Sequence, residues 1–203
     1  LTVLEADEST RYLVLEMGAS GPGHIAYLTD IAPLDAAGVL MIGHAHMGGF
    51  GSIEGVAAAK AEIIAGLRPE GIAILNADDA RAAAMAELAP ARVLTFSARG
   101  RQADLRAENV DLDAAARAAF DLHLPGLAEP RRVQLAVAGV HNVSNALAAA
   151  GLALAAGIAP ELIAERLGSV SIESPHRMDI SELSGDLLLI DDSYNANIDS
   201  MTA

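Results

Sequence analysis

The sequence predicts an α/β fold: a mostly parallel sheet with helices on both faces, plus a small antiparallel β flap. Short apolar runs alternate with stretches of helical periodicity along most of the chain. Such runs are typical of parallel strands, which are buried on both faces. Polar residues gather just after these runs, where open α/β sheets bind ligands. From residue 97 the pattern becomes more polar and irregular, which indicates the flap within residues 98–130.

Composition limits the classes of function. Hydrophobic residues make up 52% of the 203 residues, enough for a substantial core. The net charge of −14 argues against a nucleic-acid-binding surface, although a local site for a phosphorylated ligand remains compatible with it. The absence of cysteine excludes disulfides and Cys-based zinc sites. No apolar run reaches transmembrane length and no signal peptide is visible, so we expect a soluble cytoplasmic protein.

The individual elements follow from periodicity, caps and breakers. Helices are expected at 1–8, 24–29, 53–67, 81–88, 141–156 and 161–167, with a turn at 68–71. Strands are expected at 12–16, 39–42, 72–75, 92–96, 131–137, 178–183 and 186–190.

The stretch from residue 38 to 60 organises the rest. A short strand leads into a glycine-rich loop that contains His46, and Ser52 then caps a helix. The apolar face of this helix is predicted to contain Ile53, Val56, Ile63 and Leu67. Lys60, the only lysine in the chain, falls on that face. Either its ammonium reaches the helix edge, or its amine is neutral or chemically modified and works in a site beside His46.

Polar residues that follow predicted strands would line one rim of the sheet: Glu16, His46, Asn76, Asp191 and Asp192. Each of them could instead be an ordinary turn or cap residue. Glu16 supplies one carboxylate for Mg²⁺, and a carbamate formed on Lys60 from CO₂ would supply a second anionic ligand. His46 could be a further ligand, or could simply bond a backbone group.

Two further groups of residues could bind a nucleotide. Asn142 and Asn145 lie three residues apart at a helix start, so their carboxamides share a face and could meet a purine edge, or could cap the helix. His176 and Arg177 precede the last strand pair, and arginine suits a transferring phosphoryl group. Asp192, after the final strand, could accept bonds from ribose hydroxyls.

Several segments together resemble the Mur ligases of peptidoglycan synthesis. In chain order they are LEMGA, IGHAH with GFGS, AKAEI, LNADD, GVHNVSNALAA, PHRM and IDDSYNANIDSM. They span nearly the whole chain, and the last is specific to the D-alanyl-D-alanine-adding branch. The resemblance implies the fold of the family's central domain.

The resemblance also implies ATP-dependent amide bond formation with Mg²⁺. UDP-N-acetylmuramoyl-tripeptide and D-alanyl-D-alanine would be the substrates, the reaction would pass through an acyl phosphate, and the enzyme would be a monomer. Carried over by position, Glu16, His46 and a carbamylated Lys60 would bind magnesium. Asn142 and Asn145 would contact the nucleotide, His176 and Arg177 the γ-phosphate, and Asp192 the ribose. Asn195 and Asn197 would position the substrate. Lys60, His46 and Arg177 would be the catalytic residues.

The family's phosphate loop, GxxGK[ST], is absent from this chain, as are the domains that grip the UDP-sugar and complete the ATP site. We therefore expect residues 1–203 to be an incomplete central domain without ligase activity of its own. A non-catalytic fragment or nucleotide-binding module of the same fold is the alternative. A folylpolyglutamate synthase is disfavoured by the SYNAN string at residues 193–197.

Overall fold

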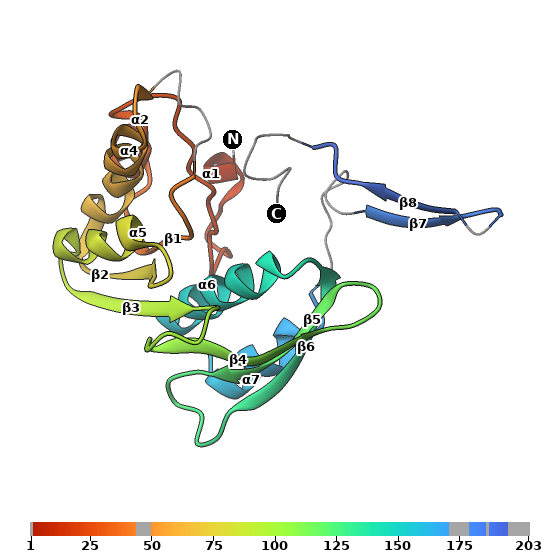
Figure 1. Cartoon of the computed structure of the whole chain (residues 1–203). Coiled ribbons are helices and arrows are strands. Elements are labelled where there is room, and N and C mark those ends of the chain that lie inside the picture. The colour runs from red at the N-terminus through yellow and green to blue at the C-terminus, as the bar shows by residue number, and fades with distance from the viewer. Residues whose placement is uncertain (1, 44–49, 171–178, 186, 195–203) are drawn as a thin grey trace.

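The computed structural model describes residues 2–43, 50–170, 179–185 and 187–194 (Figure 1). Its main feature is a six-stranded sheet in the order β1-β2-β3-β4-β5-β6. The strands are β1 (Leu34–Val39), β2 (Leu67–Asn76), β3 (Arg92–Ser97), β4 (Leu105–Leu112), β5 (Arg117–His123) and β6 (Arg131–Ala138). The pairs from β1 to β4 are parallel, and β4–β5 and β5–β6 are antiparallel. The predicted mostly parallel sheet is confirmed, and the antiparallel strands at 98–130 extend the same sheet.

Helices cover both faces of the sheet, as predicted (Figure 1). The described helices are α1 (Thr2–Glu5), α2 (His24–Ile31), α4 (Ile53–Ala65), α5 (Ala80–Ala84) with a 3₁₀ turn (Met85–Leu88), α6 (His141–Ala155) and α7 (Pro160–Leu167), and α2 packs on α4. Strand β2 shows how the faces divide, because successive side chains point to opposite sides. Ile74 packs in the core that includes α6, whereas Ala73 and Leu75 pack in the core that includes α4. No described helix has the length and apolar character needed to cross a membrane.

The region around β1 and β2 differs from the prediction in two places. Strand β1 ends at Val39, where the predicted strand begins, and residues 68–71 lie inside β2 as an irregularity in its register with β1. Pairing with β2 holds the weakly β-forming segment at 34–38 in the sheet. Beyond Val39, the side chains of Asn76 and Asp79 bond the backbone of Leu40 and Ile42, and the strand ends there.

The strand predicted at 12–16 is wrong, because residues 10–19 form no helix or strand. Tyr12 and Val14 are 55% and 82% exposed. An apolar run becomes a strand only where a neighbouring strand takes up its N–H and C=O groups, and no strand in the described part of the chain pairs with this one. Periodicity alone could not reveal that lack of a partner.

The last two strands, β7 (Asp179–Leu183) and β8 (Leu187–Asp191), form close to their predicted positions, but they pair antiparallel with each other in a sheet of their own. Figure 1 shows this hairpin standing apart from the six-stranded sheet. Asp191 therefore ends a strand of a different sheet from Asn76. The prediction that all five polar residues follow strands of a single sheet is therefore wrong, since Glu16 follows no strand either, whereas His46 lies outside the described residues.

Candidate functional site

The candidate site lies at the rim formed by the carboxyl ends of β1, β2 and β3. Open α/β sheets bind ligands at this edge because loops from several strands converge there. Here the converging groups are the backbone of residues 40–42 after β1, Asn76 at the end of β2, and Ser97 at the end of β3. Helix α4, which contains Lys60, packs against β1 and β2.

Helix α4 begins as the sequence predicts. The Ser52 hydroxyl accepts a hydrogen bond from the Gly55 N–H at 3.1 Å, and Glu54 lies in the first turn. The cap satisfies one of the free N–H groups of the helix start, and the carboxylate complements its positive dipole end. The buried residues of α4 are Val56, Ala59 and Ile64. The inward face is thus rotated slightly from the predicted one, on which Ile53 and Ile63 are only half-buried.

Lys60 is half-buried beside that face. Its Nζ donates a hydrogen bond to the backbone carbonyl of Met41 at 2.8 Å. Burial lowers the pKa of Lys60 below its usual value, and attraction to Asp79 opposes the change. The amine is therefore held at the rim by a specific acceptor, in surroundings that make it easier to deprotonate than an exposed lysine.

Three side chains bond three consecutive residues after β1. Asn76 donates its Nδ2 to the Leu40 carbonyl at 2.7 Å, Lys60 bonds the Met41 carbonyl, and the Ile42 N–H donates to Oδ2 of Asp79 at 2.7 Å. Asn76 is 7% exposed. Asn76, at the end of β2, and Asp79, just beyond it, thus fix the path of the chain as it leaves β1.

The neighbouring carboxylates of the LNADD segment are both engaged within the protein. Oδ1 of Asp79 caps α5 by accepting from the N–H groups of Arg81 and Ala82. Asp78 accepts from the Ser97 hydroxyl at 2.7 Å and from the Ala98 N–H at 2.8 Å, which holds the turn after β3. These contacts give Asp78 and Asp79 turn and cap roles and leave no carboxylate oxygen of either residue without a partner.

The predicted metal group is only partly described. Glu16 is exposed and lies in a segment without regular structure, and His46 lies outside the described residues. No group of three or more His, Asp or Glu side chains is arranged to hold a metal ion within the described ranges. The association of Glu16, His46 and Lys60 therefore stays a prediction.

Asn142 and Asn145 begin α6 and form a chain of hydrogen bonds. Asn145 donates its Nδ2 to Oδ1 of Asn142 at 2.9 Å, and Asn142 donates its Nδ2 to the Ala138 carbonyl at 2.7 Å. Neither interaction caps a helix N–H, so the capping interpretation is wrong. The pair ties α6 to the end of β6 and leaves Asn145 exposed at the surface, as the predicted nucleotide face requires.

The other predicted binding residues are less fully described. Asp192 is exposed just after β8. His176, Arg177, Asn195 and Asn197 lie outside the described residues.

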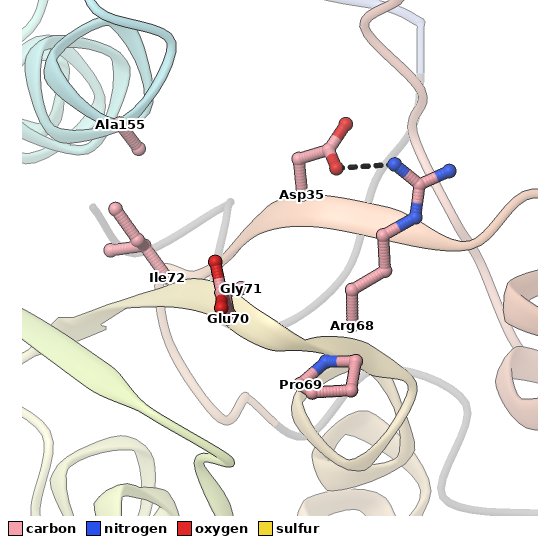
Figure 2. Close-up of a pocket in the computed structure, with 7 residues that line it drawn as sticks. All are labelled: Asp35, Arg68, Pro69, Glu70, Gly71, Ile72 and Ala155. Atoms are coloured by element: carbon pink, nitrogen blue, oxygen red, sulfur yellow. Dashed lines mark hydrogen bonds and ion pairs between the residues drawn. The ribbon is translucent and has the colours of Figure 1, made fainter.

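A pocket lies at the other end of the strands, lined by Asp35, Arg68, Pro69, Glu70, Gly71, Ile72 and Ala155 (Figure 2). Asp35 is near the start of β1, and Arg68 is near the start of β2, where the strand register is irregular. An exposed ion pair joins the two. Because this pocket opens at the amino ends of the strands, it is not part of the rim site.

Glu62 is a residue whose role the sequence did not reveal. It lies two residues beyond Lys60 in the same helix, and its carboxylate accepts from the N–H groups of Gly23 and Ala26 at 2.7 and 3.0 Å. It thus caps α2 from a distance of almost forty residues in the sequence, and α2 has no cap from its own N-terminal side chain. The AKAE run contained Glu62, but no local pattern connects it with Gly23.

Comparison with known proteins identifies the family. Residues 1–153 match the Mur ligase middle domain. A UDP-N-acetylmuramoyl-tripeptide–D-alanyl-D-alanine ligase of Mycobacterium bovis is 45% identical over 202 residues, covering 100% of this chain and 39% of that protein.

Solved structures agree with this match. A crystal structure of MurF from Acinetobacter baumannii has a TM-score of 0.91 at 37% identity, covering 99% of this chain and 43% of the other. A MurF ligase from Thermotoga maritima in complex with ADP has a TM-score of 0.76 at 27% identity, covering 93% and 42%. The chain spans less than half the length of each of these relatives. By its sequence and its fold, the chain belongs to the Mur ligase family.

Proposed function

We propose that this chain is the central part of an ATP-dependent ligase that joins D-alanyl-D-alanine to UDP-N-acetylmuramoyl-tripeptide in peptidoglycan synthesis. The observation that carries the proposal is its similarity, from end to end, to ligases of that name. The rim of the sheet supports it, because a half-buried lysine with a lowered pKa is held there. ATP and the nucleotide-linked substrate are consistent with a cytoplasmic enzyme, which we expect to act as a monomer.

The proposed reaction has two steps. The terminal carboxylate of the tripeptide attacks the γ-phosphorus of ATP, the bond to the β-phosphate oxygen breaks, and ADP leaves. The amine of D-alanyl-D-alanine then attacks the acyl carbon, phosphate leaves with the bonding electrons, and the nitrogen loses a proton. The product is an amide, and positioning and charge stabilisation are the main tasks of the protein.

The residues present fit a bound Mg²⁺. Glu16 is exposed and has no hydrogen bond or ion pair within the described ranges, so its oxygens are available. Lys60 would become an oxygen ligand only as a carbamate, and its lowered pKa favours the neutral amine that reacts with CO₂. Together with His46 and phosphate oxygens, this is the small ligand set that Mg²⁺ usually takes from a protein. The ion would neutralise negative charge on the phosphates.

The nucleotide and substrate contacts are proposed for the remaining residues. Asn145 is exposed at the start of α6 and is oriented by Asn142, so this pair could meet the adenine. We assign His176 and Arg177 to the γ-phosphate, Asp192 to the ribose, and Asn195 and Asn197 to positioning of the tripeptide substrate.

A chimera tests the proposal. This chain replaces the matching segment of the M. bovis ligase, and phosphate release is measured with and without D-alanyl-D-alanine. We expect release that depends on the dipeptide, its loss in Lys60→Ala, and partial recovery when short carboxylic acids fill the space left by the carbamate. Lys60→Arg, which keeps the charge but forms no carbamate, should stay inactive.

A folded chimera without dipeptide-dependent release would refute the proposed function. It would favour a non-catalytic nucleotide-binding module of the same fold. Full activity in Lys60→Arg would refute the carbamate role while leaving the ligase assignment intact.

A further inference from the structure

The hydrogen bonds after β1 assign a task to two residues that take no part in the proposed chemistry. We propose that Asn76 and Asp79 are positioning residues, which hold the end of β1 so that the Met41 carbonyl fixes the Lys60 amine. The proposal deepens the proposed function, since it concerns the placement of the same lysine.

The geometry supports this assignment on both sides of Met41. Its carbonyl is the acceptor for Lys60, and it stands between two residues that are themselves bonded, Leu40 by Asn76 and Ile42 by Asp79. A backbone held at both neighbours cannot turn its carbonyl away without breaking one of these bonds. The acceptor of the Lys60 amine is therefore held in place by residues at the end of β2 and the start of α5, and not only by its own helix.

Each positioning residue is in turn fixed by a second bond. Oδ1 of Asn76 accepts from the Asp78 N–H at 2.8 Å, and Oδ1 of Asp79 accepts from the N–H groups that begin α5. Ile42 is 6% exposed, so its N–H lies where loss of its acceptor is costly. Asn76, Asp79 and their bonds to Leu40 and Ile42 form what we call the clamp. The clamp is anchored in the sheet and at the start of α5, which makes it rigid.

The experiment uses the single lysine of the chain. An amine-specific acetylating reagent has only two targets, Lys60 and the α-amino group, and mass spectrometry separates them. The α-amino group gives an internal reference rate. The exchange rate of the Ile42 amide, followed by NMR, reports the clamp itself.

Two variants loosen the clamp in different ways. Asp79→Ser keeps a residue that caps α5 well but removes the acceptor for Ile42. Asn76→Ala removes the donor to Leu40 without changing the charge. We expect either variant to raise acetylation of Lys60 roughly fivefold relative to the α-amino group, the factor that corresponds to one ordinary hydrogen bond. The Ile42 amide should exchange faster in Asp79→Ser.

Asp78→Ser is the matched control, because Asp78 is the adjacent half-buried carboxylate but bonds the turn after β3. Its acetylation rate should stay within about twofold of wild type. Asn76→Ala is the deciding variant, because Asp79→Ser also removes the carboxylate that attracts the Lys60 ammonium. An unchanged Lys60 rate in a folded Asn76→Ala or Asp79→Ser chain would overturn the proposal, as would an equal rise in Asp78→Ser. Asp79→Asn replaces the serine variant if the latter does not fold. No nucleotide or substrate is needed, so this outcome is independent of the ligase assay.

Discussion

The hydrogen bonds between the Glu62 carboxylate and the start of α2 predict that Glu62→Ala lowers the free energy of unfolding. In Glu62→Ala, the N–H groups of Gly23 and Ala26 lose a carboxylate that accepts from both at 2.7 and 3.0 Å. Gly23 offers no side chain in its place, so the start of α2 would depend on water. The same contact ties α2 to the helix that contains Lys60.

The size of the effect follows from two terms. A lost N-terminal cap costs about 0.5–2 kcal/mol, and loss of a negative charge at a helix start costs about 0.3–1 kcal/mol at an exposed site. Because Glu62 is half-buried and water can partly replace it, we expect about 1–2 kcal/mol in the free energy of unfolding. For a chain of this length, that corresponds to a fall in Tm of roughly 3–6 °C.

Urea denaturation followed by circular dichroism measures the change, and hydrogen exchange locates it at Gly23 and Ala26. Glu62→Gln, which keeps one acceptor oxygen without the charge, should fall between wild type and alanine. Glu165→Ala is the control: Glu165 is an exposed glutamate of α7 without a hydrogen bond or ion pair in the described part of the chain, and its loss should cost under about 0.5 kcal/mol. Equal losses in Glu62→Ala and Glu165→Ala would contradict the capping role.

Two further predictions concern the glycines around α6 and the pH dependence of stability. Gly139→Ala should destabilise the chain by about 1–3 kcal/mol, mainly because Gly139 has φ +104°, which a residue with a side chain rarely adopts; the exposed His141 ring, 2.5 Å from the added Cβ, can move aside. Gly157→Ala, with φ +79° and open space, should cost only about 1 kcal/mol, and equal losses in urea denaturation would count against the greater backbone strain at Gly139. Because the folded state lowers the pKa of Lys60, the unfolded chain binds more protons between that lowered value and the usual 10.5, so the free energy of unfolding should rise with pH in this window. Lys60→Met should remove that rise in denaturation curves at neutral pH and at about pH 10; an identical rise in the variant would assign it to another group.

Much of the local structure could be predicted from the sequence. The helix after Ser52, the helix that starts at Pro160 and the long alanine-rich helix at 141–155 follow from caps and periodicity, which act over a few residues. The predictions of a strand at 12–16 and a turn at 68–71 were wrong because strand pairing, unlike capping and periodicity, depends on distant residues. Whether an extended segment joins a sheet depends on a partner far away in the sequence, which no local pattern contains.

The sequence by itself determined the chemistry available to this protein: a single lysine on a largely apolar helix, amides at the start of another helix, and acidic residues after a strand. Only the tertiary structure decided which of these groups have hydrogen-bond partners within the protein. Lys60 bonds a carbonyl 19 residues away, and Asp79 bonds an amide 37 residues away. Such contacts form because the sheet brings the ends of β1 and β2 together, and for that reason Asp79 holds the backbone instead of presenting a free carboxylate.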